Sequence, residues 1–509
     1  MKKLLTALAA LIILFVQPAF SEAATGKAYP KKISVIVQTG QSASIYLAGN
    51  YQLKNLQTGQ TAILTYVTLN LNHDGSTVVA TYPGGSQKST SGFDVEEVTT
   101  EIAQFTTETE MRSGATTGYP IVQTFKAGEG ADYINSFTNA AGEVWYNVRP
   151  QAGKSAGWVI AKNVKRVSAS TLNTSRVNSG TSYRGSYHVK PTSNKQIQLV
   201  NFLDMEDYLK GVVPNEMPAL WHKEALKAQA IAARSYASHD LLLYDSARSQ
   251  VYKGYSGENS LANTAIKETE GLVVRYNGKV VQTFFYSTSG GRTANAWDVW
   301  GSSKTTFPYL ASVEDKYEAS PYSNWTETFT PASILPKFGL PVTATLYDIT
   351  TENNGANGEV TGVTVKTSAG DKTIRGNEGV IRGLFPVNKV SGYTTLYSSW
   401  FTLKSTKTQP GVAVQTPDGV VDLPEMKGQM VLTPTGEITL SDSEVQVQTS
   451  SGIVSATGGT GEVTSITVNG KGFGHRIGMS QYGAKGYAEN GMRAADIMKH
   501  YFPGTTVSK

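Results

Sequence analysis

The stretch GVVPNEMPALWHKEALKAQAIAARSYA, residues 211–237, sets one carboxylate, Glu216, between two prolines and immediately ahead of an alanine-rich helical pattern. A proline disrupts a helix interior but fits its first turn. The pattern therefore predicts that Pro214 lies outside the helix and that Pro218 lies in its first turn. Glu216 is then expected on a stiff loop beside the helix N-terminus.

Two roles are open for Glu216. Near a helix N-terminus the helix dipole favours the ionised carboxylate, so a catalytic acid there needs burial to raise its pKa. Met217, Leu220 and Trp221 can supply apolar walls for that purpose. The alternative is that Glu216 only caps the helix.

Two cations follow on the helix. Lys227 and Arg234 are seven residues apart, which places them on nearly one face, about 10 Å apart along the axis. Alanines fill most of the other positions, so the helix is expected to be closely packed all round. The two cations then line a groove suited to a glycan or a carboxylate-bearing substrate, or else they are simply solvated.

The first residues match a secretory signal peptide. Lys2 and Lys3 precede an apolar run, and small residues follow it, so cleavage is expected after Ala23. A retained membrane anchor is the alternative, although the apolar run is short for a bilayer. With no later transmembrane pattern, the mature chain is expected to be exported and soluble or wall-associated.

The composition narrows the chemistry. The 509 residues contain no cysteine, which excludes disulfides and thiolate chemistry. The net charge is only +5 and no basic run occurs, which argues against nucleic acid as a partner. The six histidines lack ligand spacing, so we expect no metal and no cofactor.

Strand patterns dominate the chain. The fold class is expected to be α+β: a β-rich multidomain exported protein with a mixed α+β catalytic core and a small barrel that resembles bacterial SH3 domains. Trp145, Tyr146 and Trp158 of that barrel belong either to its core or to a ligand-binding face. The expected divisions are 1–23 (signal peptide), 30–100 (β-rich segment), 106–167 (SH3-like domain), 182–404 (core), 405–462 (β-rich insertion) and 463–509 (the C-terminal part of the core).

A glycine-rich motif, GKGFGHRIGMSQYGA, covers residues 470–484. Its spacing is not that of a dinucleotide-binding loop. The glycines allow backbone to approach a ligand closely, with His475, Ser480 and Gln481 as hydrogen-bond donors, or they only form a tight strand-to-helix turn.

The motif FFYSTSGGRT contains Ser287 and Ser289. The nucleophile elbow G-x-S-x-G is missing, and no Asp/His set is spaced for a triad. A serine hydrolase is therefore not indicated.

Five motifs of the chain appear in the following order: VNFLDMEDYLKGVVPNEMP, AQAIAARSYA, FFYSTSGG, FPYLASVED and GFGHRIGMSQYGA…HYFPGTTV. Taken together, they resemble the SpoIID/LytB family of bacterial cell-wall proteins. The sporulation branch of that family consists of lytic transglycosylases that act on peptidoglycan glycan strands. Its LytB branch enhances a wall amidase. The resemblance implies one of these two functions, with peptidoglycan, and for LytB an amidase, as the partner.

The resemblance also implies roles for single residues. Glu216 falls at the catalytic acid, and Tyr309 at a tyrosine of the substrate groove. Ala311 and Glu318 depart from the lysine and aspartate of the sporulation enzyme. The full set expected to bind substrate is Lys227, Arg234, Ser287, Ser289, Tyr309, Glu318, His475, Ser480 and Gln481.

Some family members carry a Cys/His zinc site before a Gln-Val-Tyr motif. Here Tyr244, Arg248 and Ser249 occupy the corresponding positions. The resemblance therefore implies that this chain has lost the zinc site.

Overall fold

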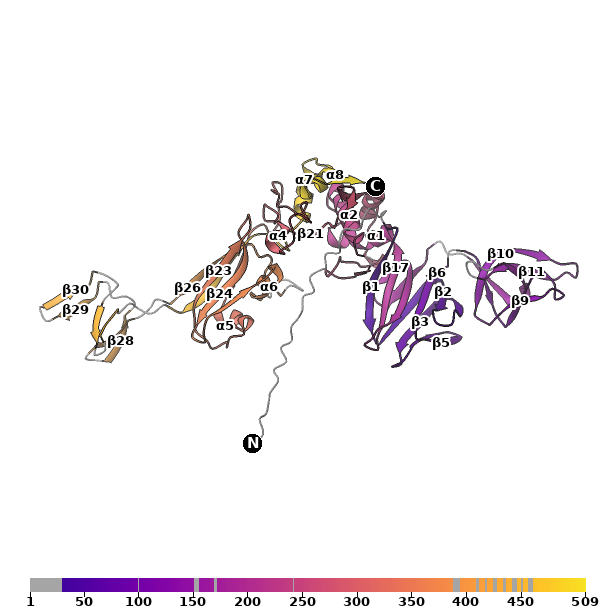
Figure 1. Ribbon diagram of the computed structural model, residues 1–509, viewed down its shortest axis with the longest axis horizontal. Coiled ribbons are helices and arrows are strands. Elements are labelled where there is room, and N and C mark those ends of the chain that lie inside the picture. The colour runs from indigo at the N-terminus through magenta and orange to yellow at the C-terminus, as the bar shows by residue number, and fades with distance from the viewer. Residues whose placement is uncertain are drawn as a thin grey trace, which may run out of the picture.

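The computed structural model of this chain (Figure 1) describes residues 30–98, 100–150, 155–168, 172–240, 242–387, 394–408, 412–416, 419–423, 428–433, 436–441, 446–449, 452–455 and 461–509. The expected signal peptide, residues 1–23, lies outside the described residues. In the described ranges no helix combines the length and the apolar character that a membrane crossing requires. The protein is β-rich, with several sheets and some helices, as predicted.

The largest sheet has eleven strands: β1 (Lys32–Gly40), β2 (Ser42–Asn55), β3 (Thr61–His73), β4 (Val78–Tyr82), β5 (Gly85–Ser89), β6 (Phe93–Glu97), β14 (Thr174–Val177), β15 (Ser182–Tyr183), β16 (Ser186–Pro191), β17 (Ile197–Asp204) and β18 (Leu242–Tyr244). Their order is β18-β1-β17-β16-β6-β2-β3-β4-β5, with β14 paired to β2 and to β15. The N-terminal strands therefore share one sheet with strands that begin after residue 172. The unit between β6 and β14 is an insertion into this sheet.

The inserted unit has seven strands: β7 (Ile102–Phe105), β8 (Thr109–Arg112), β9 (Ile121–Phe125), β10 (Gly130–Thr138), β11 (Val144–Arg149), β12 (Gly157–Ile160) and β13 (Val164–Val167), with the 3-10 turn η1 (Ala161–Asn163). Their pairing runs β13-β7-β10-β11-β12-β8-β9, and β13 and β9 do not pair within the described ranges. The closed barrel that we expected is therefore not seen. Trp145 is buried but lies outside the small apolar core, and its Nε1 donates to Glu143 Oε2 at 3.3 Å. Trp158 is half-buried, with its ring centroid 5.9 Å from that of Phe137.

A helical layer packs against the large sheet and shares its core. It consists of α1 (Met205–Glu216), α2 (Lys223–Ala237), α3 (Ser260–Glu268), α7 (Gln481–Glu489) and α8 (Ala494–Tyr501), with the short elements η2 (Tyr255–Gly257), α4 (Ala296–Val299), β19 (Val273–Tyr276), β20 (Lys279–Val280), β21 (Phe285–Tyr286), β34 (Met479–Ser480) and β35 (Thr506–Ser508). Helix α2 lies at its centre and packs against the other four helices. Twelve of its 15 residues are buried, which the alanine pattern predicts because small side chains allow close approach on every side.

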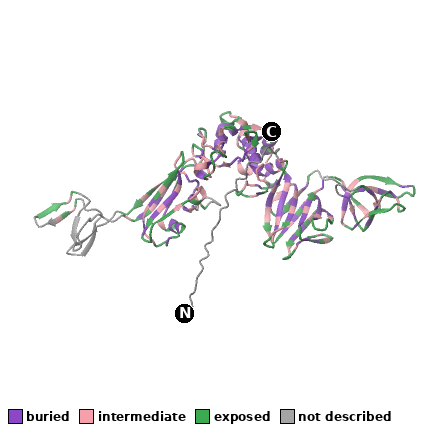
Figure 2. Ribbon diagram, viewed as in Figure 1, coloured by how far each residue is buried: buried purple, intermediate pink, exposed green. Residues whose placement is uncertain are grey.

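A second core lies between residues 325 and 473. It is formed by β22 (Trp325–Phe329), α5 (Pro331–Ile334), η3 (Leu335–Phe338), β23 (Leu346–Asn354), β24 (Glu359–Thr367), β25 (Lys372–Arg375), α6 (Glu378–Gly383), β26 (Phe401–Lys407) and β33 (Val463–Gly470). Strands β26 and β33 pair with each other and flank the predicted β-rich insertion. Three hairpins are described there: β27 (Val412–Thr416) with β28 (Gly419–Leu423), β29 (Met430–Thr433) with β30 (Gly436–Thr439), and β31 (Gln446–Thr449) with β32 (Gly452–Ser455). Figure 2 shows the buried strands of the two cores on either side of the helical layer.

Arg476 joins the two cores. Its side chain is fully buried, and Nη1 donates to Glu359 Oε1 at 3.0 Å, where β24 begins. Nε and Nη2 donate to the backbone oxygens of Ser289 and Arg292, each at 2.8 Å, in the segment that follows β21. The guanidinium also lies 4.1 Å from the ring centroid of Trp400. One charged side chain thus connects elements of both cores.

We expect Glu359→Ala to destabilise the protein by about 3–5 kcal/mol, because it leaves the guanidinium of Arg476 buried without a counter-charge. Glu352→Ala is the matched control. Its ion pair with Arg375 is on the surface, with side chains 45% and 66% exposed, so a loss of about 0–1 kcal/mol is expected. Chemical denaturation followed by tryptophan fluorescence measures the free energy of unfolding of each variant. Equal losses in the two variants would contradict a stabilising role for the buried Arg476–Glu359 ion pair.

Candidate active site

Glu216 is the last residue of α1 and not a loop residue ahead of α2. Helix α1 continues through Pro214, and α2 begins only at Lys223, so Pro218 lies in the connecting loop. The expectations for both prolines and for the loop position of Glu216 are therefore wrong. Pro214 is tolerated because it sits in the last turn, where its missing N–H costs a single helical hydrogen bond.

The surroundings of Glu216 favour its protonated form. Its side chain is only partly exposed, and burial raises the pKa of the carboxyl group. The Val251 N–H donates to Oε1 at 2.7 Å, and a hydrogen bond from the Gln481 side chain also acts on the carboxyl group; both lower the pKa, but burial outweighs them. At a helix C-terminus the dipole also disfavours negative charge, the opposite of the effect expected from the sequence.

The predicted apolar walls are only partly present. Met217 is fully buried, Trp221 is half-buried, and Leu220 is 88% exposed. The Trp221 ring packs against that of Tyr482, with centroids 4.7 Å apart. The start of α7 lies beside Glu216, because its first residue, Gln481, hydrogen-bonds to the Glu216 carboxyl group.

A polar network next to Glu216 was missed by the sequence analysis. Gln481 Nε2 lies 3.5 Å from Oε1 of the buried Gln229, and Tyr208 Oη donates to Gln250 Oε1 at 2.7 Å. Gln250 directly precedes Val251, the backbone donor to Glu216. The Gln-Val-Tyr motif, residues 250–252, is the sequence signal for this network, since it contains Gln250 and Val251.

Glu318 brings several predicted residues together at the start of α7. It accepts hydrogen bonds from the backbone N–H groups of Ser289 (2.5 Å) and Gly290 (2.8 Å). It also accepts one from Ser480 Oγ at 2.6 Å, and Ser480 is the N-cap of α7. The Ser287 backbone oxygen accepts from Ser480 Oγ at 3.3 Å. Both oxygens of Glu318 thus hold residues 287–290, here called the serine loop, against α7, whose first residue, Gln481, lies beside Glu216.

A second titratable carboxyl group lies under this loop. Asp315 is 3% exposed and accepts a hydrogen bond from Tyr501 Oη at 2.8 Å. Burial first, and then the charge of Glu318, raise the pKa of Asp315 to about 7. At Gly483 an added Cβ would lie 2.3 Å from Asp315 Oδ2, so only glycine fits there. Asp315 is not among the site residues predicted from the sequence.

His475 is a neutral side chain packed among aromatic rings. Its Nδ1 accepts from the Ile477 N–H at 3.1 Å, so the ring proton resides on Nε2, which faces the Phe285 oxygen at 3.2 Å. Burial lowers the pKa of His475 to about 4. Its ring centroid lies 5.0 Å from that of Trp300. With both nitrogens bonded to backbone, His475 shapes the segment between the two cores.

The two helix cations do not line a common groove. Arg234 is fully buried and makes a bidentate ion pair with Glu206, at 2.9 and 2.7 Å. Lys227 instead pairs with Glu224 at 2.9 Å and Glu268 at 2.6 Å. Tyr309 is 4% exposed and packs 5.7 Å from Tyr276, measured between ring centroids. In this structure all three side chains therefore contact other residues of the protein, and their predicted contact with substrate stays a prediction.

The positions of the family zinc site are occupied by a packed pair. The Arg248 guanidinium lies 3.7 Å from the ring centroid of Tyr244, and Ser249 Oγ accepts from the Tyr244 N–H at 3.2 Å. Within the described ranges, no three or more His, Cys, Asp or Glu side chains are grouped to hold a metal ion.

Comparison with known proteins gives consistent matches. Residues 193–276, which include Glu216, match the family model SpoIID, described as "Stage II sporulation protein". The amidase enhancer of Bacillus subtilis (strain 168) is 33% identical over 307 residues, a match that covers 59% of this chain but only 40% of the enhancer. Stage II sporulation protein D of the same organism is 29% identical over 336 residues, covering 61% of this chain and 76% of that protein. A stage II sporulation protein D of Bacillus amyloliquefaciens is also 29% identical, over 342 residues.

Residues 193–276 of the chain therefore form a region of the SpoIID family, and longer stretches of the chain are similar to an amidase enhancer and to stage II sporulation proteins D.

Proposed function

We propose that this protein is an exported, wall-associated lytic transglycosylase that cleaves the bond between N-acetylmuramic acid and N-acetylglucosamine in peptidoglycan. The observation that carries the proposal is the state of Glu216: a partly exposed carboxyl group whose pKa is raised by burial. A general acid needs this combination, because a raised pKa favours the protonated form and the exposed part of the group can reach the substrate.

One carboxyl group is sufficient for the reaction. Glu216 donates its proton to the glycosidic oxygen, and the bond from that oxygen to C1 of the muramoyl residue breaks. The resulting carboxylate then accepts the proton of the muramoyl 6-hydroxyl as that oxygen bonds to C1. The products are a free 4-hydroxyl and a 1,6-anhydro sugar, and no water is consumed. Ordinary glycosidases need a second carboxylate, which either acts as the nucleophile or activates a water molecule.

The neighbouring carboxyl groups fit supporting roles. Both oxygens of Glu318 are occupied by Ser289, Gly290 and Ser480, so Glu318 positions the loop and is not a nucleophile. Asp315 is enclosed and bonded to Tyr501. Gln481 and the Val251 N–H hold the Glu216 carboxyl group in one orientation, which contributes to catalysis by alignment.

A second function is favoured by one specific observation, the 33% identity to the amidase enhancer, together with the departures at Ala311 and Glu318. In this alternative the protein is a non-catalytic wall-binding activator of an amidase. The inserted unit, residues 106–167, would then serve as an SH3-like wall-binding module.

We expect Glu216→Gln to abolish glycan cleavage without lowering thermal stability. The amide keeps the shape and can still accept from the Val251 N–H, and it removes a group whose ionisation is opposed by burial. Amidase-stripped glycan strands are incubated with each variant, and anhydromuramoyl ends are detected by mass spectrometry. Glu489→Gln, at the exposed end of α7, is the control and should cleave as wild type does. Reducing ends in place of anhydro ends would indicate a hydrolase.

The pH dependence provides a separate test. Since the acid must be protonated, cleavage should fall as pH rises through the raised pKa of Glu216. The Gln481 hydrogen bond lowers that pKa, so Gln481→Met should move the alkaline limb of kcat/KM to higher pH, even if the rate itself drops. A limb that stays in place, or activity that keeps rising into the alkaline range, would mean that Glu216 is not the acid.

The enhancer alternative predicts a different pattern in the same variants. Glu216→Gln would then leave the stimulation of a purified wall amidase unchanged. Deletion of residues 106–167 would lower retention on isolated cell walls in a pull-down assay. Loss of amidase stimulation in Glu216→Gln would contradict a purely non-catalytic role.

A further inference from the structure

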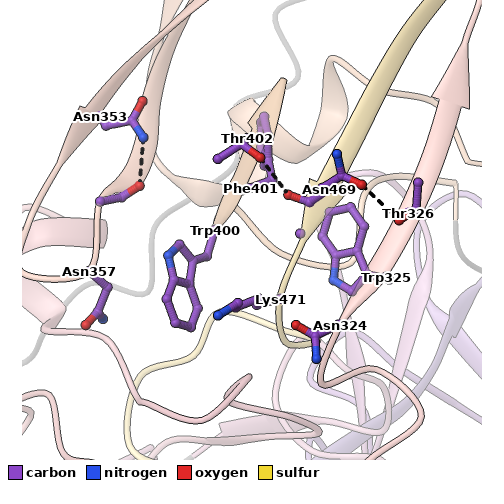
Figure 3. Close-up of a pocket in the computed structure, with 12 residues that line it drawn as sticks. Asn324, Trp325, Thr326, Asn353, Asn357, Trp400, Phe401, Thr402, Asn469 and Lys471 are labelled. Carbon is purple, nitrogen blue, oxygen red and sulfur yellow. Dashed lines mark hydrogen bonds between the residues drawn. The ribbon is translucent and has the colours of Figure 1, made fainter. Parts of the chain in front are cut away.

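A cleft of about 570 Å³ opens in the second core, apart from Glu216 (Figure 3). It lies over one end of β22, β33 and β26 and beside the turn between β23 and β24. Its size falls in the range of roughly 300–1,000 Å³ that is usual for sites that enclose a small ligand. Its lining residues are Asn324, Trp325, Thr326, Asn353, Asn357, Gly358, Trp400, Phe401, Thr402, Asn469, Gly470 and Lys471.

The lining has a distinct chemistry. It presents four carboxamides, two hydroxyls, two indoles and a single ammonium group, and no carboxylate is among the lining residues. Such a surface suits a ligand that is rich in hydroxyl and amide groups and is neutral or negatively charged. A nucleic acid is less well matched, because a phosphate backbone calls for several cations along its path.

Trp400 is the aromatic platform of the cleft. Its indole is half-buried, and the Arg476 guanidinium lies 4.1 Å from the ring centroid, which fixes its position. Figure 3 shows the ring between Asn357 and Lys471. Trp325 is more deeply buried, with Nε1 bonded to the Gly472 oxygen at 2.8 Å. One indole thus remains available to pack against the apolar face of a sugar ring, while the other forms the floor.

Polar groups beside Trp400 retain hydrogen-bonding capacity. Asn469 Oδ1 accepts from Thr326 Oγ1 at 3.0 Å, which leaves its amide nitrogen free within the described part of the chain. Asn324 is exposed at the same rim. Lys471 is exposed, with Nζ 5.0 Å from the Trp400 ring centroid. An acetamido sugar can bond to the amides, and a carboxylate on the sugar can pair with Lys471.

The cleft and the candidate active site lie on one continuous segment. Asn469 and Lys471 line the cleft, and Gln481, which contacts Glu216, comes ten residues after Lys471. Ten residues span at most roughly 35 Å, a length suited to an extended polymer. Arg476 lies between them and ties the Trp400 ring to the serine loop.

We propose that this cleft is a second glycan-binding site, which holds acetamido sugars, with Lys471 recognising a sugar-borne carboxylate, while another part of the same strand reaches Glu216. The identity of the strand as peptidoglycan rests on the proposed function. The proposal that the cleft binds acetamido sugars rests only on the residues that line it.

Binding is measured by calorimetry with full-length protein in the Glu216→Gln background, which prevents cleavage. The probes are a tetramer of β-1,4-linked N-acetylglucosamine and a glycan oligomer that contains N-acetylmuramic acid. Trp400→Ala should weaken both by about tenfold, the loss expected for an aromatic contact worth about 1.4 kcal/mol. Lys471→Gln should weaken only the muramic acid oligomer, roughly two- to fivefold, with a loss that shrinks as salt is added.

Matched controls separate binding from folding. Asn324→Ala changes an exposed rim residue and should weaken both probes without lowering the melting temperature, even if Trp400→Ala unfolds the second core. Asn354→Ala and Lys366→Gln alter exposed residues of the same unit outside the lining and should bind as the parent does.

The outcomes distinguish the two proposals. If glycan binding depends on Trp400 and Asn324 but the wild-type protein never cleaves glycan, the proposed binding site is supported and the proposed transglycosylase activity is refuted. If Asn324→Ala and Lys471→Gln leave the affinity unchanged while the wild type cleaves glycan, the proposed binding site is refuted. The proposed transglycosylase activity is then still supported. Binding of a sugar-free wall peptide or an oligonucleotide in place of both glycans would also overturn the proposed binding site.

Discussion

The buried guanidinium of Arg476 is the constraint on which the arrangement of the site depends. It occupies a left-handed backbone position, with φ of 63°, in the segment between β33 and β34. From there it reaches the serine loop, the start of β24 and the face of Trp400. A planar group with five fixed donors can satisfy several oxygens at once, which a lysine cannot do. Elements that border both cores therefore contact this one side chain. Its hydrogen bonds stabilise the left-handed backbone conformation of Arg476, which would otherwise be unfavourable.

The position of Glu216 decides what its carboxyl group can do. At a helix N-terminus it would be an ionised cap, but at the C-terminal end of α1, with burial on most sides, it favours the proton. The hydrogen bonds from Val251 and Gln481 act against burial and lower the pKa of the carboxyl group. The proposed reaction requires this group to give up its proton and take one back. The raised pKa of Glu216 therefore depends more on its position at the C-terminal end of α1 than on the residues next to it in the sequence.

The sequence predicted a β-rich fold and the closely packed alanine helix, because composition and periodicity carry that information. It failed at Pro214, since the rule that excludes proline from helices does not apply with the same force in a last turn. It did not identify the partners of Lys227 and Arg234, because their spacing fixes a shared face but not their ion pairs, and Glu206 and Glu268 are supplied by other elements. Arg476 and the Trp400 cleft depend on contacts between distant segments, which no local pattern reveals.

The proposed glycan site, if occupied, relates the two candidate functions to each other. Binding energy gained far from the scissile bond can align a strand across Glu216, where it lowers the barrier only if it is used in the transition state. The same energy would hold a non-catalytic protein on the wall. One scaffold can thus serve both functions, and the difference rests on whether the strand held at Trp400 also places a glycosidic oxygen within reach of the Glu216 proton. The segment from Asn469 to Gln481 determines that alignment, because it carries residues of both places and is fixed between them by Arg476.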